Sequence, residues 1–172
     1  LYTFLREMEF NRLLSSVISA YGEPKLSNFS DEKKNKEKHQ QINSKNYHLI
    51  TNSNEIDEWI KEAEEVGEVA VDTETNSLDP HQADLIGVSL CSKIGKACYI
   101  PIGHKSSKCI KKDIVIKKLK PLLEDSSVKK IGQNIKFDFI VLYKQGITIS
   151  SMEDTMLMSY VLDAGKNRHN MD

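Results

Sequence analysis

The sequence predicts an α/β fold in which helices pack on a mixed β-sheet. Residues 68–75, 84–92 and 96–102 have the patterns of three strands that turn back on each other. Helical and strand patterns then alternate between residues 111 and 162. Antiparallel strands followed by this alternation favour one mixed sheet flanked by helices, and the chain contains no internal repeat.

The N-terminal part divides into a helix and a polar segment. Residues 1–21 place apolar side chains at the spacing of one helix face, and the helix is expected to end at Gly22. Residues 25–45 are polar and Lys-rich, so they bury too little apolar surface to order themselves. We predict three parts, 1–24 (helical), 25–45 (a linker) and 46–172 (the folded domain), with a DNA-gripping basic arm as the alternative for the linker.

The folded domain is expected to begin with a short strand and a helix. Residues 47–51 form the strand candidate, and Ser53 or Asn54 can cap a helix that continues to about Val66. Gly67 closes this helix. Its predicted buried stripe consists of Ile56, Trp59, Ile60 and Ala63.

The next strands are expected to form a hairpin. Ile94 and Gly95 lie between two apolar runs, and glycine supplies the positive φ that a tight turn requires. This register would place Cys91 opposite Cys98. Two explanations fit that pair: a redox bridge, or two small side chains that fill one face of the sheet.

The C-terminal half alternates between helices and a strand. We predict a helix over 111–124, which Pro121 is able to bend or break, then a strand over 129–133. A second helix covers 136–145, and Asp154 caps a third helix that ends near Leu162. The third helix is expected to bury some of its apolar residues, namely Met156, Leu157, Tyr160 and Val161.

The bulk composition excludes several classes of protein. The formal net charge of −1 does not indicate a globally basic nucleic-acid binder, although a local basic patch is compatible with it. No apolar run is long enough to span a bilayer, and no secretory signal pattern is present. The three cysteines form no CxxC pair, which suits a reducing cytoplasm. The chain begins with Leu1, so we expect it to be a piece of a larger protein.

Two acidic residues follow a buried strand pattern in the stretch "VAVDTETNSLD". Successive side chains of a strand point to opposite faces, so Asp72 and Glu74 share one face and Thr73 points the other way. Two neighbouring carboxylates repel each other, and a divalent cation between them removes the repulsion. The alternative is that both acids simply meet solvent at the end of the strand.

A second polar cluster, "GQNIKFD", lies at the start of the helix predicted over 136–145. Asn134 and Asp138 are one helical turn apart on one face. Asn134 is also a good capping residue, which is the simpler explanation for it. Parallel topology would bring this helix start beside the strand of Asp72, so that three acids converge on one hydrated Mg²⁺ or Mn²⁺ site.

Taken in order, these motifs resemble a known family. "DTET" with "NSL", then "GQNIKFD", "DTMLMSYVL" and "RHNMD", are similar to the 3′→5′ proofreading exonuclease domain of bacterial DNA polymerase I, within the DEDD exonuclease superfamily. The resemblance runs from about Tyr47 to Asp172 and implies an RNase H-like fold. The N-terminal "FLREMEFNRLL" resembles the last helix of the preceding 5′ nuclease region of that polymerase.

The resemblance implies a set of site residues. Asp72, Glu74 and Asp138 match the acids that bind two catalytic Mg²⁺ (or Mn²⁺) ions. The residues that match those gripping a single-stranded 3′ end are Thr75, Leu78, Gln133, Asn134 and Phe137. Leu78 and Phe137 have an ordinary alternative as packing residues, although stacking on an aromatic ring holds a frayed base by about 1–3 kcal/mol.

The implied function is proofreading, in which two metal ions hydrolyse single-stranded DNA 3′ ends and release nucleoside 5′-monophosphates. The implied partners are the polymerase and 5′ nuclease domains of the same parent chain, which acts as a monomer without a membrane. The third motif of the family, Y-x-x-x-D, does not occur in these 172 residues, so the fragment is expected to be weak or inactive. Two alternatives are a catalytically silent DNA-positioning module and an RNase D-like exoribonuclease.

Overall fold

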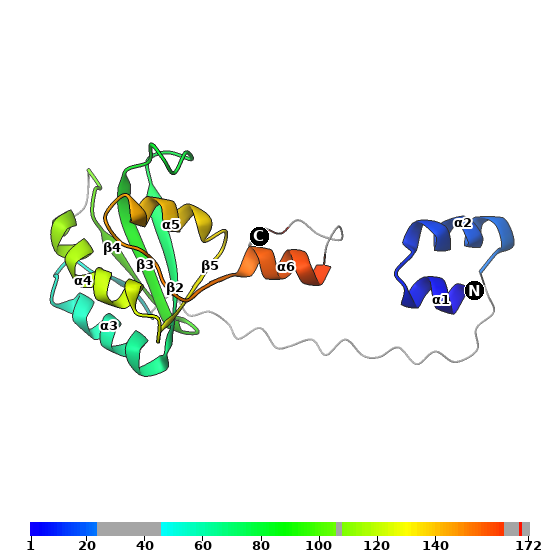
Figure 1. The fold of residues 1–172 in the computed structure, drawn as a ribbon, viewed down its shortest axis with the longest axis horizontal. Helices are drawn as coiled ribbons and strands as arrows, with labels where there is room; N and C mark the ends of the chain where they lie inside the picture. The colour runs from blue at the N-terminus through cyan, green and yellow to red at the C-terminus, as the bar shows by residue number, and fades with distance from the viewer. Residues whose placement is uncertain (24–45, 106–107, 164–168, 170–172) are drawn as a thin grey trace. The chain divides into compact units, whose positions relative to one another are not determined.

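The computed structural model describes residues 1–23, 46–105, 108–163 and 169 (Figure 1). The chain forms two compact units, Leu1–Gln40 and Gln41–Asp172. The segment 25–45, predicted to be a linker, lies outside the described residues. None of the described helices is both long and apolar enough to cross a bilayer.

The N-terminal segment forms two helices, α1 (Tyr2–Glu7) and α2 (Asn11–Tyr21), so the prediction of one continuous helix is wrong. The chain turns at Glu9, whose φ of 56° is left-handed. The Glu9 and Phe10 N–H groups donate to the carbonyls of Arg6 and Leu5, which is the hydrogen-bond pattern that ends many helices. Glycine usually occupies this left-handed position, so a glutamate there gives no signal in the sequence.

The second unit is built on one six-stranded mixed sheet. The strands follow the order β1-β4-β3-β2-β5-β6 across the sheet. Strand β3 pairs antiparallel with β2 and β4, whereas the β1–β4, β2–β5 and β5–β6 pairs are parallel. The strands are β1 (Tyr47–Leu49), β2 (Glu68–Thr75), β3 (Leu85–Lys93), β4 (Lys96–Pro101), β5 (Lys129–Gly132) and β6 (Met152–Asp154).

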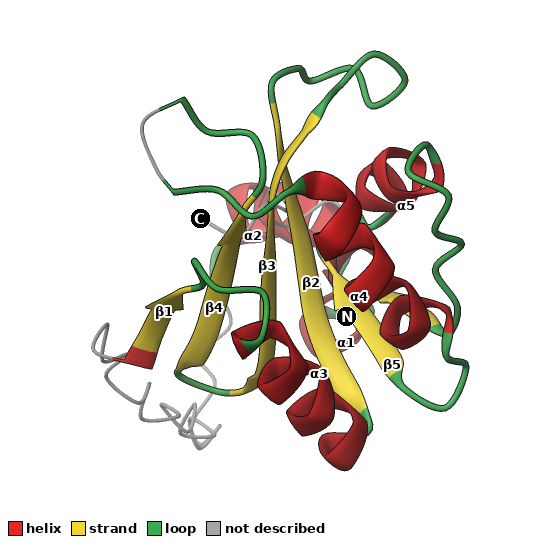
Figure 2. Ribbon diagram, turned by 90° about the vertical axis from the view of Figure 1, so that its left-hand side faces the viewer, coloured by secondary structure: helices red, strands yellow, loops and turns green. Residues whose placement is uncertain are grey.

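Three helices cover one face of this sheet (Figure 2). They are α3 (Glu55–Val66), α4 (Lys112–Glu124) and α5 (Lys136–Tyr143). Gly67 ends α3 with a φ of 81°, as predicted, and α4 continues through Pro121. The fold is therefore the predicted α/β arrangement of a mixed sheet flanked by helices.

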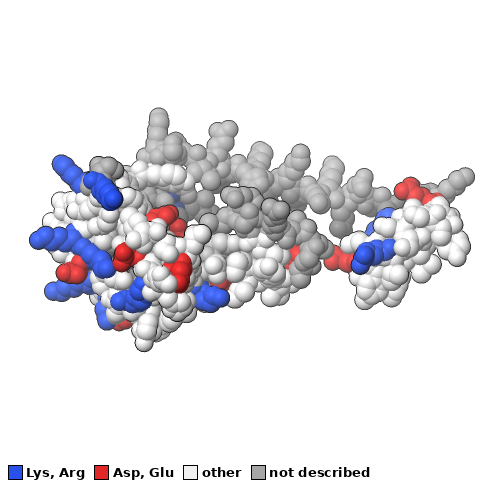
Figure 3. All heavy atoms as spheres, turned by 90° about the horizontal axis from the view of Figure 1, so that it is seen from above, with Lys and Arg blue, Asp and Glu red and all other residues white. Residues whose placement is uncertain are grey.

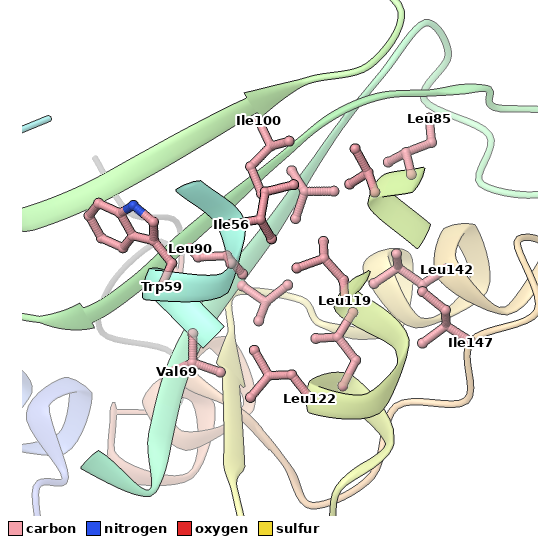
Figure 4. Close-up of a cluster of buried hydrophobic side chains, with 14 of the residues drawn as sticks. Ile56, Trp59, Val69, Leu85, Leu90, Ile100, Leu119, Leu122, Leu142 and Ile147 are labelled. Atoms are coloured by element: carbon pink, nitrogen blue, oxygen red, sulfur yellow. The ribbon is translucent and has the colours of Figure 1, made fainter. Parts of the chain in front are cut away.

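The hydrophobic core fills the space between the sheet and these helices (Figure 4). Strand β2 contributes Val69 and Val71, and α3 contributes Ile56, Trp59 and Ala63, which is most of its predicted stripe. The side chains that approach them from other strands, helices and the loop after α5 include Leu90, Ile100, Leu119, Leu122, Leu142 and Ile147. This packing holds β2 at the centre of the unit.

The β3–β4 hairpin departs from the predicted register. Lys93 pairs with Lys96 around a turn at Gly95, which has the expected positive φ of 80°. An irregularity then shifts the pairing, so that Leu90 and not Cys91 lies opposite Cys98. The shift moves the two sulfurs onto different faces of the sheet. Cys98 is buried, and neither Cys91 nor Cys98 forms a disulfide.

The last helix, α6 (Thr155–Asp163), also differs from the prediction. None of its residues is buried, and Leu157, Tyr160 and Val161 are exposed. Periodicity marks the apolar side chains of a helix but does not show whether another element covers them. The expectation that this helix buries part of its apolar side is wrong for the described residues.

Lys130 is a fully buried cation within β5. Its ammonium donates hydrogen bonds to the carbonyl oxygens of Asp125 (2.5 Å), Val128 (2.6 Å) and Leu122 (3.4 Å). These carbonyls lie at and just beyond the C-terminal end of α4, where the helix dipole favours a positive charge. Lys130 therefore joins the end of α4 to the strand beside β2.

We predict that Lys130→Met lowers the free energy of unfolding by about 1–3 kcal/mol, because the buried carbonyls lose their donor. Urea denaturation followed by circular dichroism measures the loss. Lys129→Met is the matched control, since the neighbouring Lys129 makes only a surface ion pair with Glu153 and should cost less than about 1 kcal/mol. Equal stability of the two variants would contradict a structural role for the buried ammonium.

Candidate active site

The end of β2 places two acids on the face of the sheet that α3, α4 and α5 leave uncovered. Asp72 and Glu74 are exposed. Val71, before them, and Thr73, between them, are buried and face the helices. The predicted alternation along this strand is therefore present in the structure. Both carboxylates can reach solvent or a ligand from one side of the strand.

Asp138 is brought to the same place by α5. Its side chain is only 3% exposed, and its Oδ1 accepts hydrogen bonds from the Thr73 backbone N–H (2.9 Å) and the Thr73 hydroxyl (2.6 Å). Strand β5 pairs with β2 only as far as Ala70, so the Thr73 N–H lies beyond the end of that ladder. Asp138 satisfies a backbone donor that the sheet leaves open.

Burial is the largest influence on the pKa values of Asp138 and Asp72. It raises the pKa of the Asp138 carboxyl to about 6, and the nearby Asp72 charge acts in the same direction, while the two bonds from Thr73 act against it. Partial burial also raises the pKa of Asp72. The site therefore disfavours additional negative charge in the absence of a cation.

The donor set fits a hard divalent cation, since all three candidate side chains offer carboxylate oxygens. Within residues 1–23, 46–105, 108–163 and 169, however, no three acidic, histidine or cysteine side chains meet closely enough to hold an ion. The structure brings Asp138 to the residue between Asp72 and Glu74, but the three carboxylates do not converge on one point. Their role as metal ligands stays a prediction.

A polar hollow of about 440 Å³ opens beside the two exposed acids. Leu78 is 97% exposed at this hollow, so it is not a packing residue of the core. Phe137, in contrast, packs partly against the core. The lining consists of Asp72, Thr73, Glu74, Thr75, Asn76, Ser77, Leu78 and Phe137.

In the view from above, acidic and basic side chains are interspersed on the second unit (Figure 3).

The loop that carries Leu78 is fastened at its base and its side. Across the start and end of the loop, the Asn76 side-chain amide donates to the Asp84 carboxylate (3.0 Å) and accepts from the Asp84 backbone N–H (2.8 Å). Lys144, at the C-terminal end of α5, donates to the carbonyl of Ala83 (2.8 Å). Asn76 belongs to the NSL motif, whereas no motif includes Asp84 or Lys144, and only their contacts identify them.

Gln133 and Asn134 lie away from this hollow. The Gln133 side chain accepts a bond from the Thr155 hydroxyl (2.5 Å) and donates to the His169 carbonyl (2.7 Å). It lines a second, mainly apolar hollow of about 300 Å³, which Asp72 also borders. Asn134 has a left-handed φ of 54°, and its backbone N–H donates to the Asp154 carboxylate.

Asp154 makes contacts beyond its predicted role as the cap of α6. It does cap that helix, because its Oδ1 accepts from the Met156 N–H at 2.9 Å. It also accepts from the N–H groups of Asn134 (3.0 Å) and Ile135 (3.1 Å) at the start of α5. Ile135 occupies the N-cap position of α5, and its own N–H is the one that Asp154 accepts, so Asn134 is not the cap residue of this helix.

A family model described as "3'-5' exonuclease" matches residues 47–172. The chain belongs to this 3′-5′ exonuclease family. A DNA polymerase I from Rhizobium leguminosarum is 43% identical over 138 residues, and one from Pseudomonas aeruginosa is 41% identical over 132 residues. These matches cover 68% and 73% of the chain but only 14% of each polymerase. The predicted resemblance to the exonuclease domain of polymerase I is confirmed.

Solved structures of nucleases share the fold of this exonuclease domain. NrnC from Brucella melitensis with bound Mg²⁺ is 27% identical with a TM-score of 0.54, and the match covers 73% of this chain and 56% of NrnC. Pol1 from M. smegmatis in complex with DNA primer-template and dNTP gives a TM-score of 0.59 at 20% identity, which shows the fold alone. The predicted RNase H-like architecture is confirmed.

We predict that raising the pH destabilises the metal-free exonuclease domain through Asp138. A carboxyl whose pKa is higher in the folded state stabilises the fold below its unfolded pKa, and this stabilisation is lost as the pH rises through the folded value. For a rise from 3.8 to about 6, the loss is roughly 3 kcal/mol.

Urea denaturation in EDTA at several values between pH 4 and pH 7 tests this expectation, with Asp138→Asn as the reference, since the amide keeps an acceptor for Thr73 and does not titrate. As the pH rises over this range, the wild-type protein should lose unfolding free energy relative to Asp138→Asn. Parallel pH profiles would contradict the raised pKa.

Proposed function

We propose that residues 47–172 form the proofreading 3′-5′ exonuclease domain of a DNA polymerase I, which hydrolyses single-stranded DNA 3′ ends to nucleoside 5′-monophosphates. The observation that carries the proposal is the contact of Asp138 with Thr73, the residue between Asp72 and Glu74. It joins two acidic motifs that are 65 residues apart in the chain. The identity of 41–43% to DNA polymerase I sequences supports this reading.

In this proposal Asp72, Glu74 and Asp138 hold two Mg²⁺ or Mn²⁺ ions. When bound, such ions supply hydroxide near neutral pH and stabilise a departing oxygen. The all-oxygen donor set and the Mg²⁺ bound by the related NrnC support the assignment. Burial disfavours the Asp138 anion, and a cation would offset that cost, so the buried carboxyl is suited to a site that is occupied during function.

The hollow beside the acids would receive the 3′ end of the strand. Leu78 projects into solvent at its rim and would wedge against the terminal base, while Thr75 would approach the terminal nucleotide. The Phe137 ring would line the path of the strand, with Gln133 and Asn134 further along it. A mismatched end frays at little cost, and only a melted end reaches the acids, so this arrangement would select errors without reading sequence.

A ribonuclease is the second candidate. NrnC, including the form bound to pGG, is 27–28% identical to this chain and supports an enzyme that acts on short oligonucleotides. The higher identity to DNA polymerases favours DNA as the substrate, polymerase and 5′ nuclease domains as the partners in one monomeric chain, and the cytoplasm as the location. Rates on matched single-stranded DNA and RNA oligonucleotides distinguish the two candidates.

We predict that Asp72→Ala, in the full-length protein that contains this sequence, lowers the rate of 5′-mononucleotide release on the order of a thousand-fold. The loss corresponds to several kcal/mol of charge stabilisation by a metal ion. Glu68→Ala is the matched control, because Glu68 lies on the same face at the other end of β2. If Asp72→Ala retained the wild-type rate on labelled single-stranded DNA, Asp72 would have no role in the reaction.

We predict that Leu78→Ala lowers kcat/KM for single-stranded 3′ ends about five-fold, which corresponds to about 1 kcal/mol of contact with the terminal base. Because Leu78 is 97% exposed, the melting temperature should not change. The control is Ile94→Ala, which removes an equally exposed side chain (90%) at the β3–β4 turn. Steady-state kinetics on a frayed primer end measure the effect, and equal kinetics for both variants would remove the wedge role from Leu78.

A further inference from the structure

We propose that Asp154 is a positioning residue for the acidic site, which it supports by fixing the start of α5 and thereby placing Asp138 against Thr73. The inference rests on the proposed function only in treating Asp138 as a ligand of the nucleolytic site. Asp154 itself touches neither Asp72 nor Glu74 in the described contacts. It acts through the backbone of the β5–α5 turn.

The contacts of Asp154 join two helix starts. Its Oδ1 accepts from the N–H groups of Asn134 (3.0 Å) and Met156 (2.9 Å), and its Oδ2 accepts from the Ile135 N–H (3.1 Å). One carboxylate therefore satisfies donors at the N-terminal ends of α5 and α6. Hydrogen bonds to an ionised acceptor at a helix N-terminus are stronger than neutral ones, and the helix dipoles favour the negative charge.

The start of α5 needs such an external acceptor. The N-cap residue is Ile135, whose own N–H is one of the four at the start of the helix that have no intrahelical partner. The preceding Asn134 is held at a left-handed φ of 54°, which costs free energy for a residue with a side chain. The two consecutive N–H groups of this turn are donated to Asp154, so its carboxylate stabilises the strained conformation.

The turn is also held from the side of the sheet. Gly132 lies opposite Asp154 in the parallel β5–β6 pairing, which brings the carboxylate beside the turn. A Cβ at Gly132 would lie 2.9 Å from Cγ1 of Ile135, so the close packing of the turn on β5 depends on glycine. The position of the first residue of α5 is therefore set by contacts with β5 and β6.

This position is transmitted to Asp138 over a single helical turn. The Phe137 and Phe139 N–H groups donate to the carbonyls of Asn134 (2.9 Å) and Ile135 (2.8 Å), so the helical bonds begin at the residues that Asp154 holds. Asp138 lies between them and reaches Thr73 with its Oδ1. A shift of the turn would move the carboxyl away from β2.

The experiment uses Asp154→Ser in the 172-residue chain. Serine is a good N-cap for α6, but its short side chain with one oxygen cannot serve both Asn134 and Ile135. Asp125→Asn is the matched control, since among the described residues the Asp125 carboxylate accepts hydrogen bonds only from Ser127 in its own turn. Asp154→Asn is a second variant of native size, whose amide keeps one acceptor oxygen but replaces the other with an NH2 group that cannot accept, so the Asn134 and Ile135 N–H groups lose one of their two acceptor atoms.

Two readouts separate positioning from general stability. The first is hydrogen exchange of the Thr73 amide by NMR, which reports its bond to Asp138 without any metal. The second is the affinity for Mn²⁺ alone, measured by electron paramagnetic resonance. With both Asp154 variants folded by circular dichroism, we expect Thr73 exchange to accelerate at least about ten-fold and the Mn²⁺ Kd to rise about 10–100-fold. Asp125→Asn should change neither quantity.

An unchanged Thr73 amide exchange rate in Asp154→Ser or Asp154→Asn would overturn the inference. Loss of the fold in both variants would overturn it too, because Asp154 would then be a general structural residue. Asp138→Asn identifies a failure of the proposed function instead. If Mn²⁺ binds Asp138→Asn as tightly as wild type, Asp138 is not a ligand, while the Thr73 exchange still decides whether Asp154 places its side chain.

Discussion

The arrangement of the acidic site follows from the unequal lengths of two neighbouring strands. Strand β2 runs from Glu68 to Thr75, but β5 pairs with it only as far as Ala70. Beyond that point the Thr73 N–H has no strand partner, and a buried donor without an acceptor is costly. Asp138 fills this position from α5, so the need to satisfy one backbone group brings a carboxyl to the end of the strand that carries Asp72 and Glu74.

Two buried ionisable side chains in this unit are stabilised by backbone groups. Lys130 donates to three carbonyls around the end of α4, and Asp138 accepts the Thr73 N–H and hydroxyl. Burial disfavours the charge of both groups, and it lowers the pKa of Lys130, although that side chain meets only acceptors and lies at a favourable helix end. Burial raises the pKa of Asp138 in spite of its two donors, which makes it the group in this pair whose charge would gain from a cation.

The sequence was informative where a pattern depends on local geometry. The bounds of β2 were predictable because apolar and polar residues alternate along it, and the β3–β4 turn was predictable because Gly95 has the required φ. The sequence was uninformative where another element decides the outcome. Strand β6 is a three-residue edge strand without a pattern of its own, and the left-handed Glu9 that divides α1 from α2 is an unusual residue for that role. The candidate acids were visible in the sequence, but the Thr73 contact was not, because half of it is made by the backbone.

The fastening of the Leu78 loop has a further consequence for the proposed exonuclease. The Asn76–Asp84 hydrogen bonds close the base of the loop, and the Lys144 bond ties it to the C-terminal end of the helix that carries Asp138. Through these bonds the proposed wedge and the buried acid are connected to one helix. A terminal base that stops against Leu78 would always lie at the same distance from the acids. Each turnover would then shorten the substrate by one nucleotide.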